Sequence, residues 1–253
     1  MTLAERVAAQ RWYHTLDLPG GVVTPGEYDL RAVSGTLPWP DLANVRCLDV
    51  GSRDGFYAFE MERRGAAEVV SIDLDDPSGI DFPGPRPPDE AIAAELAAGN
   101  QAFELARDAL GSRVQRRHIS AYDLHEDAVG RFGFAVLGTL LLHLRDPVGA
   151  LTAVRRVTDR LLVNDAVRPT LLRSPVARLA PTRDEPFWWM LNPAALRRAV
   201  EAAGFAVEAA GGPYHVPWGP GRPAPALLAG GLRQVPARLS MRRGALHAWI
   251  LGS

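Results

Sequence analysis

Two aspartates and two glycines in this sequence have a spacing that suits the binding of a small polar ligand. Asp49 lies at the end of a short apolar run, and Gly51 and Gly55 delimit the turn that follows it. Asp73 lies at the end of the next apolar run. A carboxylate at that place accepts hydrogen bonds from a ribose diol, and a helix beginning after Gly55 offers free N–H groups to a ligand. The pattern therefore predicts a crevice that binds a nucleoside.

The segments around these residues predict a βαβ unit. Residues 45–50 have the length and apolar character of a strand, residues 56–64 have helical composition, and residues 68–74 alternate as a second strand. A helical crossover forces the two strands to run parallel. We therefore expect both carboxylates at the same edge of one sheet.

Strands and helices are predicted to alternate along the rest of the chain. The predicted strands are 114–119, 134–142, 161–165, 205–210 and 245–251, and the predicted helices are 2–16, 90–110, 147–157 and 193–204. Seven strands alternating with helices fit a doubly wound, Rossmann-like α/β sheet.

The absence of an internal linker predicts one domain over residues 1–253. Within it we expect an amino-terminal helical arm over 1–44 and a ligand-binding core over 45–210. Residues 211–243 are rich in Gly, Pro and Arg and predict a loop or lid, so that 211–253 comprises this loop and the final strand.

Composition narrows the class of protein. The longest apolar stretch, 134–142, is too short to cross a bilayer, and no signal peptide pattern opens the sequence, so we expect a cytoplasmic protein with no membrane association. The net charge of −1 argues against a broad nucleic-acid surface. All 28 basic residues are arginine, which excludes chemistry that depends on a lysine.

The turn after Asp49 distinguishes between cofactors. A dinucleotide fingerprint requires a glycine where Arg53 stands, so a nicotinamide or flavin dehydrogenase is disfavoured. An acid before a Gly-rich turn, with a second acid ending the next strand, instead resembles motif I of the class I S-adenosylmethionine (SAM) methyltransferases. That resemblance implies SAM as the cofactor, Asp49 as the partner of its methionine amino group, and an antiparallel final strand.

The resemblance also implies which residues bind the cofactor. They come from the turn, from the end of the second strand, from the segment after the third strand where the family contacts adenine, and from the end of the fourth strand. These residues are Asp49, Gly51, Ser52, Gly55, Asp73, Leu74, Ala121, Tyr122 and Gly138. Core packing is the alternative interpretation of the Tyr122 ring, and no metal site is expected.

Longer segments are similar to one branch of this family. WYHTLDLPGGVVTPG, LLLHLRDP and FWWMLNPAALRRAVEAAGF resemble proteins related to the tRNA wobble-uridine carboxymethyltransferases. Those enzymes bind carboxy-SAM through a lysine and a tyrosine, whereas this chain has no lysine, has Leu142 at the tyrosine position, and has His14 at the arm position that corresponds to the lysine in this resemblance. Ordinary SAM and a small-molecule acceptor are therefore favoured, with tRNA as the alternative acceptor.

Five further residues are candidates for the transfer itself. His143, after the fourth strand, is the first candidate for a general base, and His14 is the second; a structural histidine is the alternative for His143. Tyr13 of the arm and the pair Trp188 and Trp189 are candidates to bind the acceptor, although each also suits core packing. The sequence thus supports a small-molecule O- or N-methyltransferase, a tRNA-modifying enzyme, or a non-catalytic SAM-binding partner protein, the last because Arg53 interrupts the turn.

Overall fold

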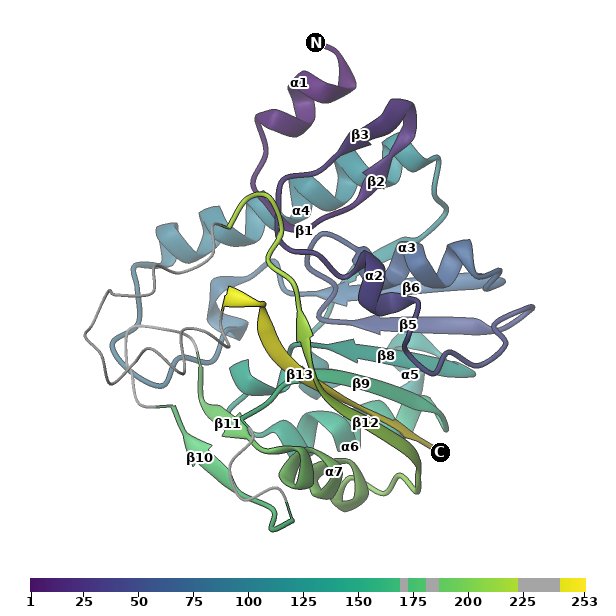
Figure 1. Ribbon diagram of the computed structural model, residues 1–253, viewed down its shortest axis with the longest axis vertical. Helices are drawn as coiled ribbons and strands as arrows, with labels where there is room; N and C mark the ends of the chain where they lie inside the picture. Colours follow the sequence, from purple (N-terminus) through teal and green to yellow (C-terminus); the bar gives the residue numbers. More distant parts are fainter. Residues whose placement is uncertain (169–172, 181–186, 223–241) are drawn as a thin grey trace.

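Seven strands form one sheet in the computed structural model, which describes residues 1–168, 173–180, 187–222 and 242–253 (Figure 1). The strand order is β12-β13-β9-β8-β5-β6-β7. The strands are β5 (Arg46–Val50), β6 (Glu68–Asp73), β7 (Gln115–His118), β8 (Phe134–Gly138), β9 (Leu161–Ala166), β12 (Val207–Val216) and β13 (Ala245–Gly252). The first five run parallel, and β13 is antiparallel to both β9 and β12. The predicted seven-stranded sheet with an antiparallel last strand is confirmed.

Helices cover both faces of this sheet, which explains why its central strands are apolar throughout. One core cluster joins the sheet to α6 (Pro147–Val157) and α7 (Pro193–Ala202). The other joins it to α3 (Phe56–Arg63), α4 (Asp89–Leu110) and the arm. Figure 1 shows these two groups of helices on opposite sides of the strands. The remaining described helices are short: α1 (Leu3–Ala8), α2 (Arg31–Ser34), α5 (Glu126–Val129), and the 3-10 turns η1 (Pro19–Gly21), η2 (Pro77–Gly79), η3 (Ala121–Asp123) and η4 (Leu141–His143).

The predicted helix boundaries agree with the observed caps. The carboxylate of Asp146 accepts the N–H of Gly149 at 2.8 Å at the start of α6, and the amide oxygen of Asn192 accepts the N–H of Ala195 at 2.8 Å at the start of α7. Gly111 ends α4 with a left-handed φ of 61°. These signals are local, so the sequence was sufficient to predict them.

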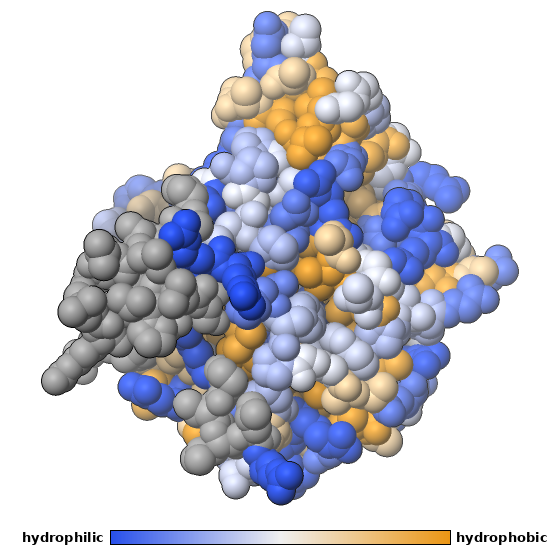
Figure 2. All heavy atoms as spheres, viewed as in Figure 1, coloured by the Kyte–Doolittle hydropathy of each residue, from blue (hydrophilic) through white to orange (hydrophobic). Residues whose placement is uncertain are grey.

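The arm differs from the prediction, because helix α1 covers only part of 2–16. The backbone then forms β1 (Trp12–His14), which pairs in parallel with β4 (Gly26–Tyr28), and a small hairpin of β2 (Asp17–Leu18) and β3 (Val22–Val23). Trp12 is 1% exposed and anchors β1 in the core. In Figure 2 a group of hydrophobic residues gathers on this arm, at the top of the view. Tertiary pairing with β4 outweighs helix propensity here.

The predicted strand 134–142 was too long, because β8 ends at Gly138. Thr139 has a left-handed φ of 52°, and its N–H donates to the carbonyl oxygen of Asn164 at 2.8 Å. The next two amides, of Leu140 and Leu141, donate to the buried carboxylate of Asp165 at 3.0 and 2.7 Å. The apolar run therefore leaves the sheet and continues as η4.

The carboxyl-terminal part also differs from the prediction. Strand β12 continues to Val216, six residues into the expected loop 211–243, and residues 223–241 of that loop lie outside the described residues. A small antiparallel pair of strands, β10 (Ala177–Leu179) and β11 (Trp189–Leu191), was not predicted. No helix among the described residues is long and apolar enough to span a bilayer.

Candidate functional site

The two aspartates at the ends of β5 and β6 lie at the same edge of the sheet. The strands are parallel neighbours, with Val50 opposite Ile72. The N–H groups of Gly51 and Ser52 both donate to the carbonyl oxygen of Ile72, at 3.0 and 3.1 Å. The turn 51–55 therefore begins directly beside the end of β6. The expected side-by-side arrangement of the two strand ends is confirmed.

Asp49 is a buried carboxylate that accepts a backbone hydrogen bond from α3. It is 1% exposed, and its Oδ2 accepts the N–H of Ala58, in the first turn of α3, at 3.0 Å. Burial raises the pKa of Asp49 to about 6. A cationic ligand beside this carboxylate would lower that pKa again, so the group fits an ammonium such as the amino group of SAM.

Asp73 is held by the turn and remains accessible. Its side chain is 20% exposed. Oδ2 accepts the N–H of Arg53 at 2.6 Å, and Oδ1 accepts the N–H of Leu74 at 2.8 Å. Oδ2 also faces Nη2 of Arg116 at 3.5 Å, whereas Oδ1 has a second lone pair that can accept a further hydrogen bond. The carboxylate therefore fits a ribose diol.

The turn between these aspartates depends on glycine at both ends. Gly51 and Gly55 have φ of 75° and 93°, a region that other residues rarely adopt. A Cβ on Gly55 would lie 2.5 Å from the ring of Phe59. Arg53, between them, also has a positive φ of 53° although it is not glycine. The turn therefore has a left-handed backbone at Arg53 without a glycine at that position.

The amino-terminal arm binds directly to this turn through Asp54. This carboxylate is 1% exposed, and its Oδ2 accepts the backbone N–H groups of Tyr13 and His14 at 2.7 and 2.8 Å. Its Oδ1 lies 2.5 Å from Nδ1 of His14. Burial opposes ionisation, but the adjacent imidazole and the two backbone N–H donors hold the pKa of Asp54 below its usual value. The sequence analysis did not assign a role to Asp54.

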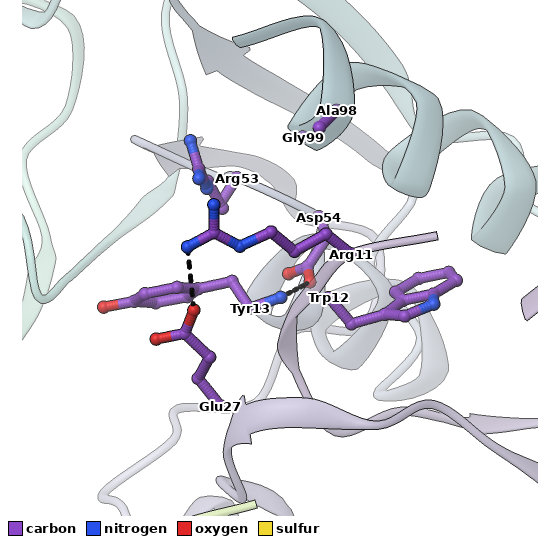
Figure 3. A pocket seen from close by; sticks show the side chains of 8 residues that line it. All are labelled: Arg11, Trp12, Tyr13, Glu27, Arg53, Asp54, Ala98 and Gly99. Carbon is purple, nitrogen blue, oxygen red and sulfur yellow. Dashed lines mark hydrogen bonds and ion pairs between the residues drawn. The ribbon is translucent and has the colours of Figure 1, made fainter. Parts of the chain in front are cut away.

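Figure 3 shows how closely the arm packs against the turn. Arg11 lies beside Tyr13, and its Nη2 is 3.2 Å from Oε1 of Glu27. The guanidinium of Arg53 lies 5.9 Å from the centroid of the Tyr13 ring and pairs with Glu95 of α4 at 3.1 Å. The cavity left between them has a volume of about 10 Å³, room for one water molecule.

Burial also affects the arm side chains expected at the site. Burial raises the pKa of Tyr13 well above its ordinary value. The imidazole of His14 is 8% exposed, and its centroid lies 5.6 Å from that of Phe56, at the start of α3. Both side chains therefore lie over the amino end of α3 and the turn, as the functional interpretation of the arm requires.

Tyr122, expected near adenine, uses its hydroxyl to join two loops. The phenol donates to Oδ2 of Asp81 at 2.7 Å and accepts the N–H of Asp146 at 3.1 Å. Asp81 also accepts the N–H of Arg145 at 2.8 Å. The ring packs against the core, and the neighbouring Ala121 is 9% exposed. The packing interpretation therefore describes the Tyr122 side chain.

Close packing explains why residue 138 is a glycine, which the sequence did not reveal. A Cβ there would lie 2.1 Å from the ring of Tyr57 on α3. The Tyr57 hydroxyl accepts from Nδ2 of Asn164 at 2.6 Å, and the amide oxygen of Asn164 accepts from the hydroxyl of Tyr214 at 2.5 Å. The glycine thus lets α3 approach β8 closely.

A second polar pair at this edge was not predicted. His247 of β13 is 2% exposed, with Nδ1 3.0 Å from the carbonyl oxygen of Ala245 and Nε2 3.0 Å from the hydroxyl of Thr139. Burial lowers the pKa of His247 to about 4, so the ring is neutral. Because a carbonyl only accepts, Nδ1 carries the proton and Nε2 accepts from Thr139.

His143 and the two tryptophans lie near the segment that follows β8. The imidazole centroid of His143 lies 5.0 Å from that of Phe187. The N–H of Trp188 donates to the carbonyl oxygen of Leu142 at 2.7 Å, and the guanidinium of Arg145 lies 5.2 Å from its ring. Nε1 of Trp189 donates to the carbonyl oxygen of Arg145 at 3.0 Å. Trp189 thus has a structural contact, and Trp188 lies beside the segment that carries His143.

Comparison with known proteins gives matches among solved structures alone. No protein-family model matches the sequence, and no curated protein matches it. A SAM-dependent methyltransferase from Mesorhizobium loti is 12% identical, with a TM-score of 0.52 over 87% of this chain and 95% of that one. The N-terminal domain of EvdMO1, solved with S-adenosylhomocysteine (SAH) and D-fucose, is 15% identical, with a TM-score of 0.56 over 98% and 93% of the two chains.

A third match has both a small-molecule substrate and SAH bound. The 1,6-didemethyltoxoflavin-N1-methyltransferase of Burkholderia thailandensis is 16% identical, with a TM-score of 0.51 over 88% of this chain and 73% of that one. At these identities the matches establish architecture. Together with the strand order, they show that the chain has the Rossmann-like fold of the class I SAM-dependent methyltransferases.

Proposed function

We propose that this protein is a SAM-dependent methyltransferase that transfers a methyl group to oxygen or nitrogen of a small molecule. The observation that carries the proposal is that Asp49 and Asp73 lie at the ends of neighbouring parallel strands, beside the turn 51–55. One carboxylate fits an ammonium and the other fits a ribose diol, so together they match the two ends of SAM. The methyltransferase fold supports the same assignment.

Each cofactor residue then has a definite role. Asp49 binds the amino group, and the turn containing Ser52 passes beneath the cofactor because Gly51 has no side chain. Asp73 binds the ribose, with Leu74 next to it at the strand end. Residues 121–122 border the adenine, and Gly138 ends the strand beside the transferring group. SAM supplies a methyl group on a sulfonium, so the protein mainly contributes orientation and exclusion of water.

Within this proposal the arm contributes the general base. An ionised Asp54 accepts hydrogen bonds and does not donate, so Nδ1 of His14 carries the proton that faces it. The lone pair of His14 then lies on Nε2, in the tautomer that a carboxylate imposes on a catalytic histidine. His14 therefore precedes His143 as the candidate base. Tyr13 lies next to His14 and is the arm residue best placed to contact an acceptor.

Calorimetric titration with SAH tests the cofactor assignment, because SAH retains the amino group and the ribose. We expect binding by the wild-type protein. For the base, His14→Asn should lower the rate of methyl transfer about a hundredfold or more while SAH affinity stays within about twofold. A variant at the other candidate, His143→Asn, serves as the comparison. A loss of transfer in His143→Asn alone would reassign the base, and an absence of SAH binding would refute the proposal.

Measurements on the same protein distinguish the proposed function from two alternative functions. A cytoplasmic location and a small-molecule acceptor are parts of this proposal, whereas the similarity of the WYHT arm to the tRNA wobble-uridine branch favours a tRNA acceptor. Mobility-shift titration with total tRNA should then show affinity that falls steeply with salt. Tight SAH binding with no transfer to a broad panel of acceptors would favour the non-catalytic SAM-binding protein that Arg53 first suggested.

A further inference from the structure

A buried arginine on the edge strand contacts both the turn and the carboxylate assigned to the ribose. Arg116 lies on β7, and its side chain is 5% exposed. Its Nη1 donates to the carbonyl oxygen of Arg53 at 2.7 Å, and its Nη2 lies 3.5 Å from Oδ2 of Asp73. Its guanidinium carbon lies 4.5 Å from the centroid of Phe103 on α4. One side chain thus connects a strand end, the turn and a helix.

These contacts act on a residue with an unfavourable backbone conformation. Arg53 has a left-handed φ of 53°, which residues with a Cβ disfavour. Its N–H donates to Asp73 at 2.6 Å while its carbonyl oxygen accepts from Arg116. The same residue is therefore held on both sides by two side chains that also contact each other. The orientation of the turn and the orientation of the Asp73 carboxylate are set together.

One nitrogen of the Arg116 guanidinium, Nε, is buried without a hydrogen-bond partner among the described residues. An unpaired buried donor destabilises the folded state, and buried charges without full hydrogen bonding are costly. Arg117, next along β7, shows the ordinary case, because its guanidinium donates to the carbonyl oxygen of Ala128 at 2.9 Å and has no buried unpaired nitrogen.

We infer that Arg116 is the positioning residue of the nucleoside site: it holds the Asp73 carboxylate and the Arg53 backbone in the arrangement that accepts the ribose hydroxyls. This inference rests on the proposed function. We expect Arg116 to affect binding of the ribose more than binding of the rest of the cofactor. Removing Arg116 should therefore weaken the contribution of the ribose hydroxyls specifically, because Asp73 then loses its ion pair and the turn loses its carbonyl contact.

The test combines a protein change with a ligand change. SAH and its 2′-deoxyribose analogue are each titrated into the wild-type protein, Arg116→Gln and the matched control Arg117→Gln. Deleting a hydroxyl that hydrogen-bonds to a carboxylate should weaken wild-type binding about tenfold or more. The quantity compared is the ratio of the dissociation constants of the two ligands. We expect the wild-type ratio in Arg117→Gln and a ratio below about threefold in Arg116→Gln. A residue with only a structural role would weaken both ligands equally and leave the ratio unchanged.

The outcomes separate this inference from the proposed function. An unchanged ratio in Arg116→Gln overturns the role of Arg116 while SAH binding still supports the methyltransferase assignment. An absence of SAH binding to the wild-type protein overturns both. If circular dichroism shows that Arg116→Gln is unfolded, Arg116→Lys decides, because it keeps the charge but cannot donate to two sites through a planar fork. A wild-type ratio in Arg116→Lys would then refute the inference.

Discussion

Two buried carboxylates, Asp49 just before the turn 51–55 and Asp54 within it, have pKa values that shift in opposite directions. Asp49 and Asp54 are each 1% exposed. Burial raises the pKa of Asp49 to about 6, whereas the His14 imidazole and two backbone N–H donors more than offset burial at Asp54 and lower its pKa. Equal burial therefore does not produce equal charge. The number of donors that the protein itself provides decides the direction of the shift.

This difference indicates what each carboxylate does. The arm supplies hydrogen bonds to both oxygens of Asp54, so this group holds the folded chain together. Asp49 has the N–H of Ala58 as its backbone donor, and its raised pKa shows that its charge is incompletely compensated by the protein. An incompletely compensated buried carboxylate is suited to a cationic ligand. The comparison thus separates a structural acid from a binding acid within one turn.

The largest expected effect is the loss of the arm contact in Asp54→Ala. Removing this buried carboxylate leaves the Nδ1–H of His14 and two backbone N–H groups without their acceptor, so the free energy of unfolding should fall by about 3 kcal/mol or more. Denaturant titration followed by tryptophan fluorescence measures this. The matched control is Asp89→Ala, whose carboxylate is 72% exposed in a surface ion pair and should change stability little. Equal stability of the two variants would remove the structural role of Asp54.

A smaller effect is expected for Asp49→Asn, and it should appear in the affinity for SAH. The amide removes the charge assigned to the ligand amino group, so SAH affinity should fall about tenfold or more. Stability of the ligand-free protein should not decrease, because a buried charge with incomplete compensation is removed. Calorimetry and thermal melting report the two quantities separately. Destabilisation without any loss of SAH affinity would reverse the roles given to Asp49 and Asp54.

The pH dependence should distinguish the two carboxylates by sign. Because the folded-state pKa of Asp49 is raised from 3.8 to about 6, the ligand-free protein loses its contribution to stability as pH rises through that interval. SAH binding requires the ionised form, so affinity should fall up to tenfold per unit below about pH 6 and level off above it.

Asp54 has the opposite linkage. Its pKa is lowered from 3.8, so its contribution to stability is present above 3.8 and is lost as pH falls further. Calorimetry from pH 5 to 8 with Asp49→Asn as the control tests the first effect, since that variant should show no inflection near pH 6. An inflection that persists in Asp49→Asn would belong to another group.

The smallest expected effect is that of Tyr122→Phe. This change removes one hydroxyl that bridges Asp81 and the N–H of Asp146, and it should lower the free energy of unfolding by about 1 kcal/mol. SAH affinity should stay within about twofold, because the contact joins loops and the ring packs in the core. A tenfold loss of SAH affinity would instead make Tyr122 a cofactor residue, like Asp49.

Local signals explain why most of the sheet and its helices were predictable. Apolar runs indicated β5, β6 and β9, and the capping pairs at Asp146 and Asn192 indicated the start of α6 and α7. The same reasoning failed where distant residues accept the backbone hydrogen bonds. Residues 12–14 pair with β4 and with Asp54, and residues 140–141 donate to Asp165, so neither segment follows its own propensity.

The sequence by itself determined the βαβ unit, the two carboxylates at its strand ends and the glycines of the turn, because those depend on the type and spacing of nearby residues. Only the tertiary structure decided that Asp54 binds the arm, that His14 faces a carboxylate, and that Arg116 contacts both Arg53 and Asp73. The physical reason is that these contacts join segments far apart in the chain. Their hydrogen bonds form once the core has placed those segments side by side. Residue spacing along the chain does not show which distant segments the fold brings together.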